Sequence, residues 1–156
     1  MKIHVIDNTG RIQPLLLATE ADVTFFSDEI QALNAVDAQM PGLILLNYAL
    51  RGEETAEYID LLVSRCSASS IVVIGDDLGD GQVLKCLLAG AKGYQTSRDL
   101  AAYIKKIVKV VADGEAWITR RMTARLLDAI RLQNLSLSNS LIAPGLYVSS
   151  SLPQQQ

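Results

Sequence analysis

The sequence has few of the side chains that carry covalent or metal chemistry: its 156 residues include one histidine, one tryptophan and two cysteines. Cys66 and Cys86 match neither a disulfide framework nor a zinc-binding spacing, which predicts two reduced, packed thiols. His4 lies inside a predicted strand without acidic or cysteine neighbours, so we expect a structural role for it. These scarcities argue against a disulfide-stabilised secreted domain and against a zinc enzyme.

Long apolar runs and an excess of basic charge are also absent. No run approaches the roughly 18 residues that a membrane span needs, and the start "MKIHVID" lacks a signal-peptide core, so we expect a cytoplasmic protein with no membrane contact. The formal net charge of −3 and the pI near 5.1 give no general attraction to nucleic acid. The length suits one domain with a proper core.

Five short apolar runs alternate with segments of helical periodicity, the clearest of which carries one apolar face formed by Leu100, Ile104, Ile107, Val108 and Val111. The runs, each a predicted strand, are residues 2–6, 23–26, 43–46, 71–74 and 92–95. Strict alternation predicts an α/β fold: a flavodoxin-like (βα)5 doubly wound parallel sheet of order 2-1-3-4-5, with a helix in each crossover. In that order the carboxyl ends of the first and third strands are neighbours. We therefore expect Asp7 and Asn47 to face one another.

An extra helix is predicted after the fifth strand–helix unit. Gly114 ends one helix, and Thr119 is placed to cap the next. The extra helix carries an apolar stripe formed by Met122, Leu126 and Ile130, which is wide enough to pack on the domain or on a second copy. The predicted domain, including this helix, covers residues 1–131.

Residues 132–156 contain no charged side chain and six serines, with two prolines and a terminal glutamine triplet. This composition is typical of a linker or tail. An alternative applies to "NLSLSNSLI", residues 134–142, because its alternating leucines would suit a strand added to the sheet edge of a partner.

Four segments carry a resemblance to a known family: "VIDN", "LILLNYALRG", "LLAGAKGYQTSRD" and "VVADGEAWITRRMTARLL". They resemble the receiver domain of two-component response regulators, specifically of LuxR/NarL-type transcription factors, over residues 1 to about 131. The resemblance implies a CheY-like fold. It also implies a flexible linker to a DNA-binding helix-turn-helix domain that this chain does not contain.

In that family five positions support phosphorylation: two Mg²⁺-binding acids, an acceptor aspartate, a Thr or Ser, and a Lys. The matching residues here are Asp7, Asn8, Asn47, Gly75 and Ser97. A carboxamide is a poor nucleophile and cannot form an acyl phosphate, and the cation that would neutralise developing charge is missing. One carboxylate is too few for Mg²⁺. The pattern predicts a degenerate pocket with no bound metal and no enzymatic activity.

Other acids lie on loops at the same edge of the sheet. We expect them to be solvated charges rather than a rebuilt cation site, because no spacing matches a coordination loop; they are Glu53, Glu54, Asp76, Asp77 and Asp80. Asp7 is expected to remain as a hydrogen-bond acceptor with Asn8 and Asn47 as neutral partners.

The stretch Trp117-Ile118-Thr119-Arg120 suggests a ligand. Phosphorylation-independent members of the resembled family bind cyclic di-GMP through a Trp-x-Thr/Ser-Arg motif, which would make Trp117, Thr119 and Arg120 nucleotide-binding residues. The alternative is structural, with the tryptophan covering a helix junction, the threonine capping and the arginine solvated.

The leading functional hypothesis is therefore a pseudo-receiver without a cofactor, acting in transcriptional regulation. It would form a homodimer through Met122, Leu126 and Ile130 and reach DNA only through a separate helix-turn-helix domain. The alternatives are a cyclic di-GMP sensor and a stand-alone interaction domain that titrates another regulator. A flavodoxin-like enzyme is disfavoured, because "DNTGRIQP" is no glycine-rich phosphate loop and no nucleophile–base pair is visible.

Overall fold

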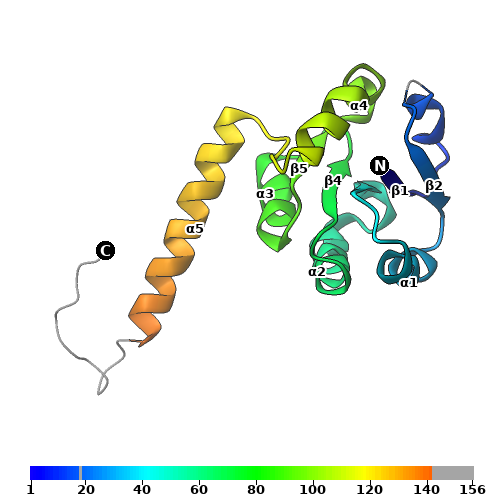
Figure 1. The fold of residues 1–156 in the computed structure, drawn as a ribbon. Coiled ribbons are helices and arrows are strands. Elements are labelled where there is room, and N and C mark those ends of the chain that lie inside the picture. Colours follow the sequence, from blue (N-terminus) through cyan, green and yellow to red (C-terminus); the bar gives the residue numbers. More distant parts are fainter. Residues whose placement is uncertain (18, 142–156) are drawn as a thin grey trace. The chain divides into compact units, whose positions relative to one another are not determined.

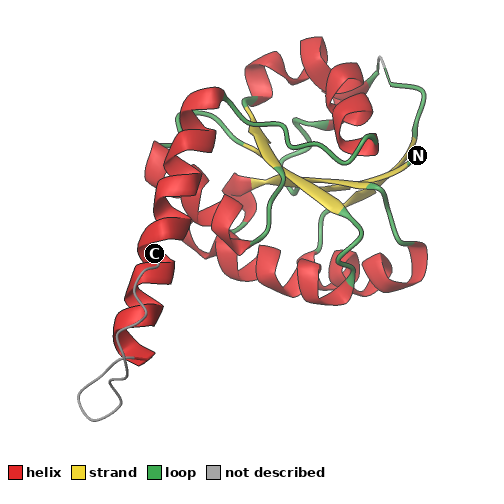
Figure 2. Ribbon diagram, turned by 60° about the vertical axis from the view of Figure 1, so that its left-hand side comes forward, coloured by secondary structure: helices red, strands yellow, loops and turns green. Residues whose placement is uncertain are grey.

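A computed structural model of the chain describes residues 1–17 and 19–141 (Figure 1). The chain divides into two compact units, Met1–Thr119 and Arg120–Gln156. In the first unit a sheet lies between two helical layers (Figure 2). The described part of the second unit is one helix, α5 (Arg120–Leu141).

The sheet confirms the predicted fold. Its five strands pair in parallel in the order β2-β1-β3-β4-β5; they are β1 (Lys2–Ile6), β2 (Asp22–Phe26), β3 (Leu43–Asn47), β4 (Ser70–Ile74) and β5 (Gly93–Gln95). The predicted bounds are within one residue of these. Strands β1, β3 and β4 are nearly continuous apolar runs because both of their faces are covered by helices.

The helical layers differ on the two faces of the sheet. One layer holds α1 (Glu29–Gln39), α2 (Thr55–Arg65) and α3 (Asp80–Ala89). The other holds α4 (Ser97–Ala112) and the 3-10 helix η1 (Gln13–Leu16), which pack against each other. The predicted apolar face of α4 is confirmed, since four of its residues are buried: Leu100, Ile104, Ile107 and Val111. Two further 3-10 turns, η2 (Tyr48–Leu50) and η3 (Gly52–Glu54), follow β3.

The first crossover differs from the prediction of a helix after every strand. Only 15 residues, 7–21, connect β1 to β2, and the only helical part is the four-residue η1. Pro14 lacks a backbone N–H, which limits how far a helix here could extend towards β1. The described residues of this crossover therefore contain one short 3-10 helix where a full helix was predicted.

The extra helix is longer than the sequence indicated. It begins at Arg120, directly after Thr119 as predicted, and it continues to Leu141 instead of ending near Arg131. Residues 134–141, for which the sequence left open a strand paired with the sheet edge of a partner, are helical in this single chain. Residues 142–156 of the predicted tail lie outside the described part. The helix continues because no glycine or proline occurs before Pro144, and absence of charge alone does not break a helix.

Both cysteines are buried free thiols, as predicted. Burial raises the pKa of the Cys86 thiol to about 11, so at neutral pH it is protonated and unreactive. Within the described residues, α5 included, no helix is long and apolar enough to cross a membrane.

His4 is a buried polar residue of β1. Its side chain is 1% exposed, its Nε2 lies 2.9 Å from the Gln39 Oε1 atom, and its Nδ1 has no hydrogen-bond partner. Its ring also contacts Phe26, with centroids 4.9 Å apart. Burial lowers the pKa of His4, because an imidazolium here would lose its water.

We expect the free energy of unfolding to fall as the pH decreases from 7 to 5. The unfolded chain binds a proton near pH 6.5, whereas folded His4 binds it only at lower pH, so protonation favours the unfolded state in this window. Urea titrations at several pH values measure the slope. The variant His4→Gln should lose it, because this is the only histidine of the chain; an unchanged slope in the variant would contradict the assignment.

Candidate functional site

Asp7 and Asn47 meet at the carboxyl edge of the sheet, as the strand order predicts. Asp7 directly follows β1 and Asn47 ends β3, and the Asn47 Nδ2 donates to Asp7 Oδ1 at 2.7 Å. The same carboxylate accepts from Thr9 N at 3.0 Å, Thr9 Oγ1 at 2.8 Å and Ile12 N at 3.4 Å. The expected partner Asn8 is instead exposed, and Thr9 takes its place.

Two opposed effects set the pKa of Asp7. Burial raises it, but the hydrogen bonds from Thr9, Asn47 and Ile12 favour the charged form and hold the pKa below its ordinary value. Oδ1 of Asp7 thus accepts three hydrogen bonds from the protein itself, and Oδ2 accepts one at 3.4 Å. Both polar atoms of the Asn47 side chain are hydrogen-bonded, because its Oδ1 also accepts from Ala49 N at 3.0 Å and caps η2.

Gly75 occupies the position of the Thr or Ser whose hydroxyl contacts the phosphate in the resembled family. The side chains of Leu78 and Tyr48 leave little room for a side chain at this position. A Cβ atom on Gly75 would lie 3.1 Å from Leu78 Cδ1 and 3.2 Å from Tyr48 Cβ. The Gly75 carbonyl accepts from the Tyr94 hydroxyl at 2.9 Å. A serine or threonine here would require Leu78 or Tyr48 to shift by a few tenths of an ångström, so close packing opposes the missing hydroxyl.

The fifth position, Ser97, forms an interaction that the sequence did not reveal. Its hydroxyl donates to Asp76 Oδ2, and its backbone N–H donates to Asp76 Oδ1 at 3.0 Å. Arg98 Nε lies 3.9 Å from the same carboxylate. The Ser97 hydrogen bond is the main reason that the pKa of Asp76 lies below its ordinary value. The loop after β4 is thereby tied to the first turn of α4.

Asp76 is exposed, as expected, but the prediction of a merely solvated charge is incomplete, because its carboxylate is bonded to Ser97. The prediction is also incomplete for Glu54, which pairs with Arg51 at 3.3 Å, and for Glu53, which accepts from Gln82 at 3.3 Å. Among the residues that the structure describes, no three His, Cys, Asp or Glu side chains are grouped so that they could hold a metal ion.

A cavity of about 250 Å³ remains between the Asn47 and Asp76 sides of this edge; it is lined by Thr9, Arg11, Ile12, Asn47, Tyr48, Ala49, Gly75, Asp76, Leu78 and Ser97. Its polar walls are largely paired with one another. The structure brings Asp7 and Asn47 into direct contact and places Gly75 and Ser97 around the same cavity, whereas Asn8 lies outside this cluster.

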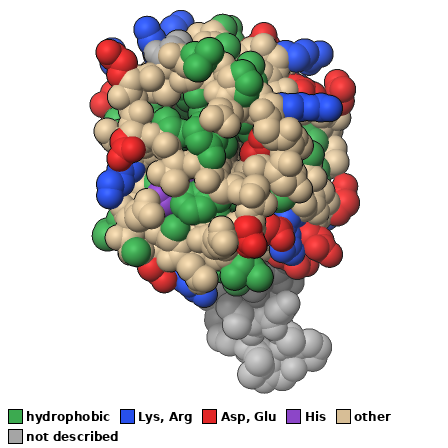
Figure 3. All heavy atoms as spheres, turned by 90° about the vertical axis from the view of Figure 1, so that its right-hand side faces the viewer, with side chains coloured by type: hydrophobic (Ala, Val, Ile, Leu, Met, Phe, Trp, Pro, Cys, Tyr) green, Lys and Arg blue, Asp and Glu red, His purple; other side chains and the backbone are tan. Residues whose placement is uncertain are grey.

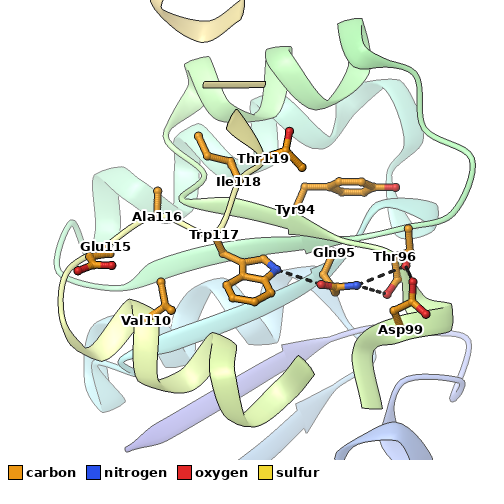
Figure 4. A pocket seen from close by; sticks show the side chains of 10 residues that line it. All are labelled: Tyr94, Gln95, Thr96, Asp99, Val110, Glu115, Ala116, Trp117, Ile118 and Thr119. Carbon is orange, nitrogen blue, oxygen red and sulfur yellow. Dashed lines mark hydrogen bonds between the residues drawn. The ribbon is translucent and has the colours of Figure 1, made fainter. Parts of the chain in front are cut away.

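A second site surrounds the Trp117 motif. Trp117 pairs with Gly93 as a parallel bridge beside β5: Trp117 N donates to Lys92 O at 2.8 Å, and Tyr94 N donates to Trp117 O at 3.1 Å. The indole Nε1 donates to Gln95 Oε1 at 2.9 Å (Figure 4). Its ring packs near Tyr103, with centroids 5.8 Å apart. These contacts correspond to the structural alternative for Trp117.

A cavity of about 500 Å³ lies beside this tryptophan (Figure 4); it is lined by Tyr94, Gln95, Thr96, Asp99, Val110, Glu115, Ala116, Trp117, Ile118 and Thr119. Its size suits a small ligand. Thr119 is thus a lining residue. Arg120, the third predicted nucleotide-binding residue, is exposed and begins α5 in the other unit.

The three residues of the predicted dimer stripe differ in exposure. Met122 is buried, Leu126 is half-buried, and Ile130 is 40% exposed. Leu127, adjacent to the stripe, is 59% exposed. The part of the stripe that is accessible therefore lies towards the middle of α5.

Comparison with known proteins gives a fold. No protein-family model matches the sequence, and no curated protein sequence matches it significantly. Solved structures do match: the isolated receiver domain of RcsB from Salmonella enterica serovar Typhimurium has a TM-score of 0.70, with 82% of this chain and 98% of that chain covered at 15% identity. The chain has the fold of a response-regulator receiver domain.

Two further structures share this receiver fold. A LuxR-family two-component response regulator from Aurantimonas sp. SI85-9A1 matches with a TM-score of 0.67 at 16% identity, covering 82% of this chain and 96% of that one. The CheY-like protein tadZ from Pseudomonas aeruginosa PAO1 matches at 0.58 and 20% identity, covering 71% and 92%. At such identities the likeness concerns the backbone fold, and function must be argued from the side chains.

Proposed function

We propose that this receiver fold is a regulatory interaction module that works without phosphorylation, in transcriptional regulation and as a homodimer. The observation that carries the proposal is the hydrogen bond from Asn47 Nδ2 to Asp7 Oδ1. The uncharged amide of Asn47 thus lies at the position where phosphoryl transfer to a receiver fold would need a nucleophilic carboxylate.

The chemistry of the neighbouring residues supports the same conclusion. Phosphoryl transfer requires a nucleophile aligned with the donor, together with a metal and a cation that stabilise the developing charge. Here Asp7 already accepts four hydrogen bonds from the protein, and Ser97 is bonded to Asp76. A phosphoryl group entering the cavity would meet the Asp76 carboxylate and Arg11, and no lysine lines the cavity.

Incubation with acetyl phosphate and Mg²⁺ tests the proposal. We expect the intact mass to stay unchanged, while a receiver domain that accepts phosphate under the same conditions gains one phosphoryl group. An acid-stable, hydroxylamine-sensitive adduct of one phosphoryl group on this chain would overturn the account of Asn47.

The dimer is proposed from the accessible apolar residues of α5. Leu127 and Ile130 are exposed leucine-sized side chains on a helix, and burial of such groups is a common source of association energy. In the full regulator the dimer would position a separate helix-turn-helix domain on DNA. A module that titrates another regulator would have the same pocket without a phosphate acceptor. It would differ by forming a complex with that regulator in place of a homodimer. Light scattering measures the self-association, and a monomer at tens of micromolar would refute it.

Cyclic di-GMP binding is a second candidate, favoured by the 500 Å³ cavity that Trp117 and Thr119 line next to Arg120 in the sequence. Asp99 and Glu115 line the same cavity and would repel phosphates, so the candidate depends on the arginine. Calorimetric titration with cyclic di-GMP tests it. Saturable binding that Arg120→Ala abolishes would support this function, and no heat of binding would remove it.

A further inference from the structure

We propose that the cavity beside Trp117 binds a linear aliphatic amine with a positive charge at each end, the chemical class of the polyamines. The cavity has a volume of about 500 Å³, and all of its lining residues belong to the receiver unit, Met1–Thr119. The inference is independent of the proposed homodimer. It assigns the cavity a different occupant from cyclic di-GMP, and the two ligands carry opposite charges.

The cavity extends along helix α4. Its lining includes Asp99, in the first turn of this helix, and Val110, eleven positions later. At about 1.5 Å of rise per residue, these two positions are about 16 Å apart. Glu115 lies next to Val110, because Glu115 N donates to Val110 O at 3.0 Å. The cavity is therefore elongated, and an extended chain fits it better than a compact molecule does.

Both ends of the cavity carry a negative charge. Asp99 lines one end and Glu115 the other, and no lysine or arginine is among the described residues that line it. The cavity at the carboxyl edge of the sheet, by contrast, is lined by one acidic and one basic side chain, Asp76 and Arg11. Acidic and basic side chains are likewise interspersed over the face of the molecule that Figure 3 shows. A carboxylate at each end favours a ligand with two separated positive charges.

The wall between the two acids is apolar and held in place by hydrogen bonds. Trp117 and Ile118 supply apolar surface. Trp117 Nε1 donates to Gln95 Oε1 at 2.9 Å, and Gln95 Nε2 donates to Thr96 Oγ1 at 3.3 Å. Thr96 Oγ1 in turn donates to Asp99 Oδ2 at 3.3 Å (Figure 4). Methylene groups can pack on the fixed indole and an ammonium group can lie over its face, so binding requires little ordering of the protein.

Lys106 is a basic side chain on the same side of α4 as Asp99, seven positions further along the helix. Its Nζ lies 6.0 Å from the centroid of the Tyr103 ring, and Lys106 does not line the cavity. The Lys106 charge opposes the binding of a cation and favours the binding of an anion. Replacing this lysine therefore tests the sign of the charge that the cavity selects.

Two diamines of equal charge test the elongated shape. The ammonium groups of extended 1,12-diaminododecane are about 16 Å apart, and those of 1,6-diaminohexane about 9 Å. We expect the longer diamine to bind at least about tenfold more tightly, because it alone reaches both carboxylates. Calorimetry measures the affinity, and the fluorescence of Trp117 localises the ligand, since this is the only tryptophan of the chain. Equal affinities, or saturable binding that leaves the fluorescence unchanged, would refute the site.

Charge substitutions show whether both ends of the cavity bind the ligand. Asp99→Asn and Glu115→Gln should each weaken the binding of spermine about threefold, and the double variant should weaken it about tenfold, because effects at distant positions add. Asp60→Asn, which removes an exposed carboxylate of α2, is the matched control and should bind as wild type does. Lys106→Gln should bind spermine more tightly. Circular dichroism verifies that each variant is folded, since Asp99 also lies in the first turn of α4.

The double variant separates charge recognition from simple apolar affinity. Without the two carboxylates the preference for the longer diamine should disappear, whereas a preference that came from methylene groups alone would persist and would contradict the proposal. No saturable binding of spermine to the wild type at about 10 mM and low salt would also overturn it. Cyclic di-GMP that changes Trp117 fluorescence in a wild type that binds no spermine would assign the cavity to the nucleotide instead.

Discussion

Replacing Asn47 by aspartate (Asn47→Asp) should lower the free energy of unfolding by about 2 kcal/mol at neutral pH. The change removes the 2.7 Å hydrogen bond to Asp7 and places two carboxylates against each other. One of the two must then bind a proton, so a folded-state pKa of the pair rises above its unfolded value. Urea unfolding at pH 7, followed by circular dichroism, measures the loss.

The pH dependence of this loss identifies its cause. A carboxyl group whose pKa is raised on folding destabilises the protein above that pKa, and the penalty disappears below the unfolded value. The difference between wild type and Asn47→Asp should therefore shrink as the pH falls towards 4. Asn8→Asp, an exposed neighbour outside the cluster, should change stability by only about 0.5 kcal/mol or less. A variant Asn47→Asp as stable as wild type at pH 7 would contradict the pairing.

Adding one methyl group at Gly93 (Gly93→Ala) should cost about 3 kcal/mol of stability. A Cβ atom there would lie 2.4 Å from the Trp117 carbonyl oxygen and 2.8 Å from Trp117 Cβ. The carbonyl belongs to the backbone and cannot turn aside, so the Trp117 segment must leave β5. The hydrogen bonds that join Trp117 to Lys92, Tyr94 and Gln95 would then be lost or lengthened.

Trp117 reports on this displacement directly, since it is the only tryptophan of the chain. Its fluorescence emission should shift to longer wavelength in native Gly93→Ala, while the wild type keeps the emission of a half-buried indole. Gly81→Ala is the matched control: Gly81 lies in α3 with open space around its Cα, and alanine there should be neutral or stabilise by up to about 1 kcal/mol. An unshifted spectrum in Gly93→Ala would show that the segment can yield without leaving β5.

The sequence predicted those parts of the fold that depend on periodicity. Apolar runs placed the strands, and the spacing of Leu100, Ile104, Ile107 and Val111 placed α4 with the correct buried face. The Asp7–Asn47 contact followed from topology alone, because the strand order makes their strands neighbours. In each case the information is local or is fixed by a general rule of parallel sheets.

The parts that sequence could not supply depend on distances between loops. Asp76 and Ser97 are 21 residues apart, and nothing in either segment distinguishes a bonded carboxylate from the neighbouring exposed ones. The helix predicted in the first crossover rests on strand–helix alternation alone, and among the residues described there only the four-residue η1 is helical. The end of α5 is not predicted correctly because loss of charge does not end a helix.

The thin cover over β2 also determines where the receiver unit opens under native conditions. Strand β2 lies at the edge of the sheet, pairs only with β1 and packs against α1 on one side, so it can detach without breaking the pairing of β3 with β4. Backbone amides of β2 should therefore exchange with deuterium through a local fluctuation well before those of the central strands. Any molecule bound against Phe25 would slow that exchange, so deuterium exchange of this one strand can report binding at the β2 edge of the sheet.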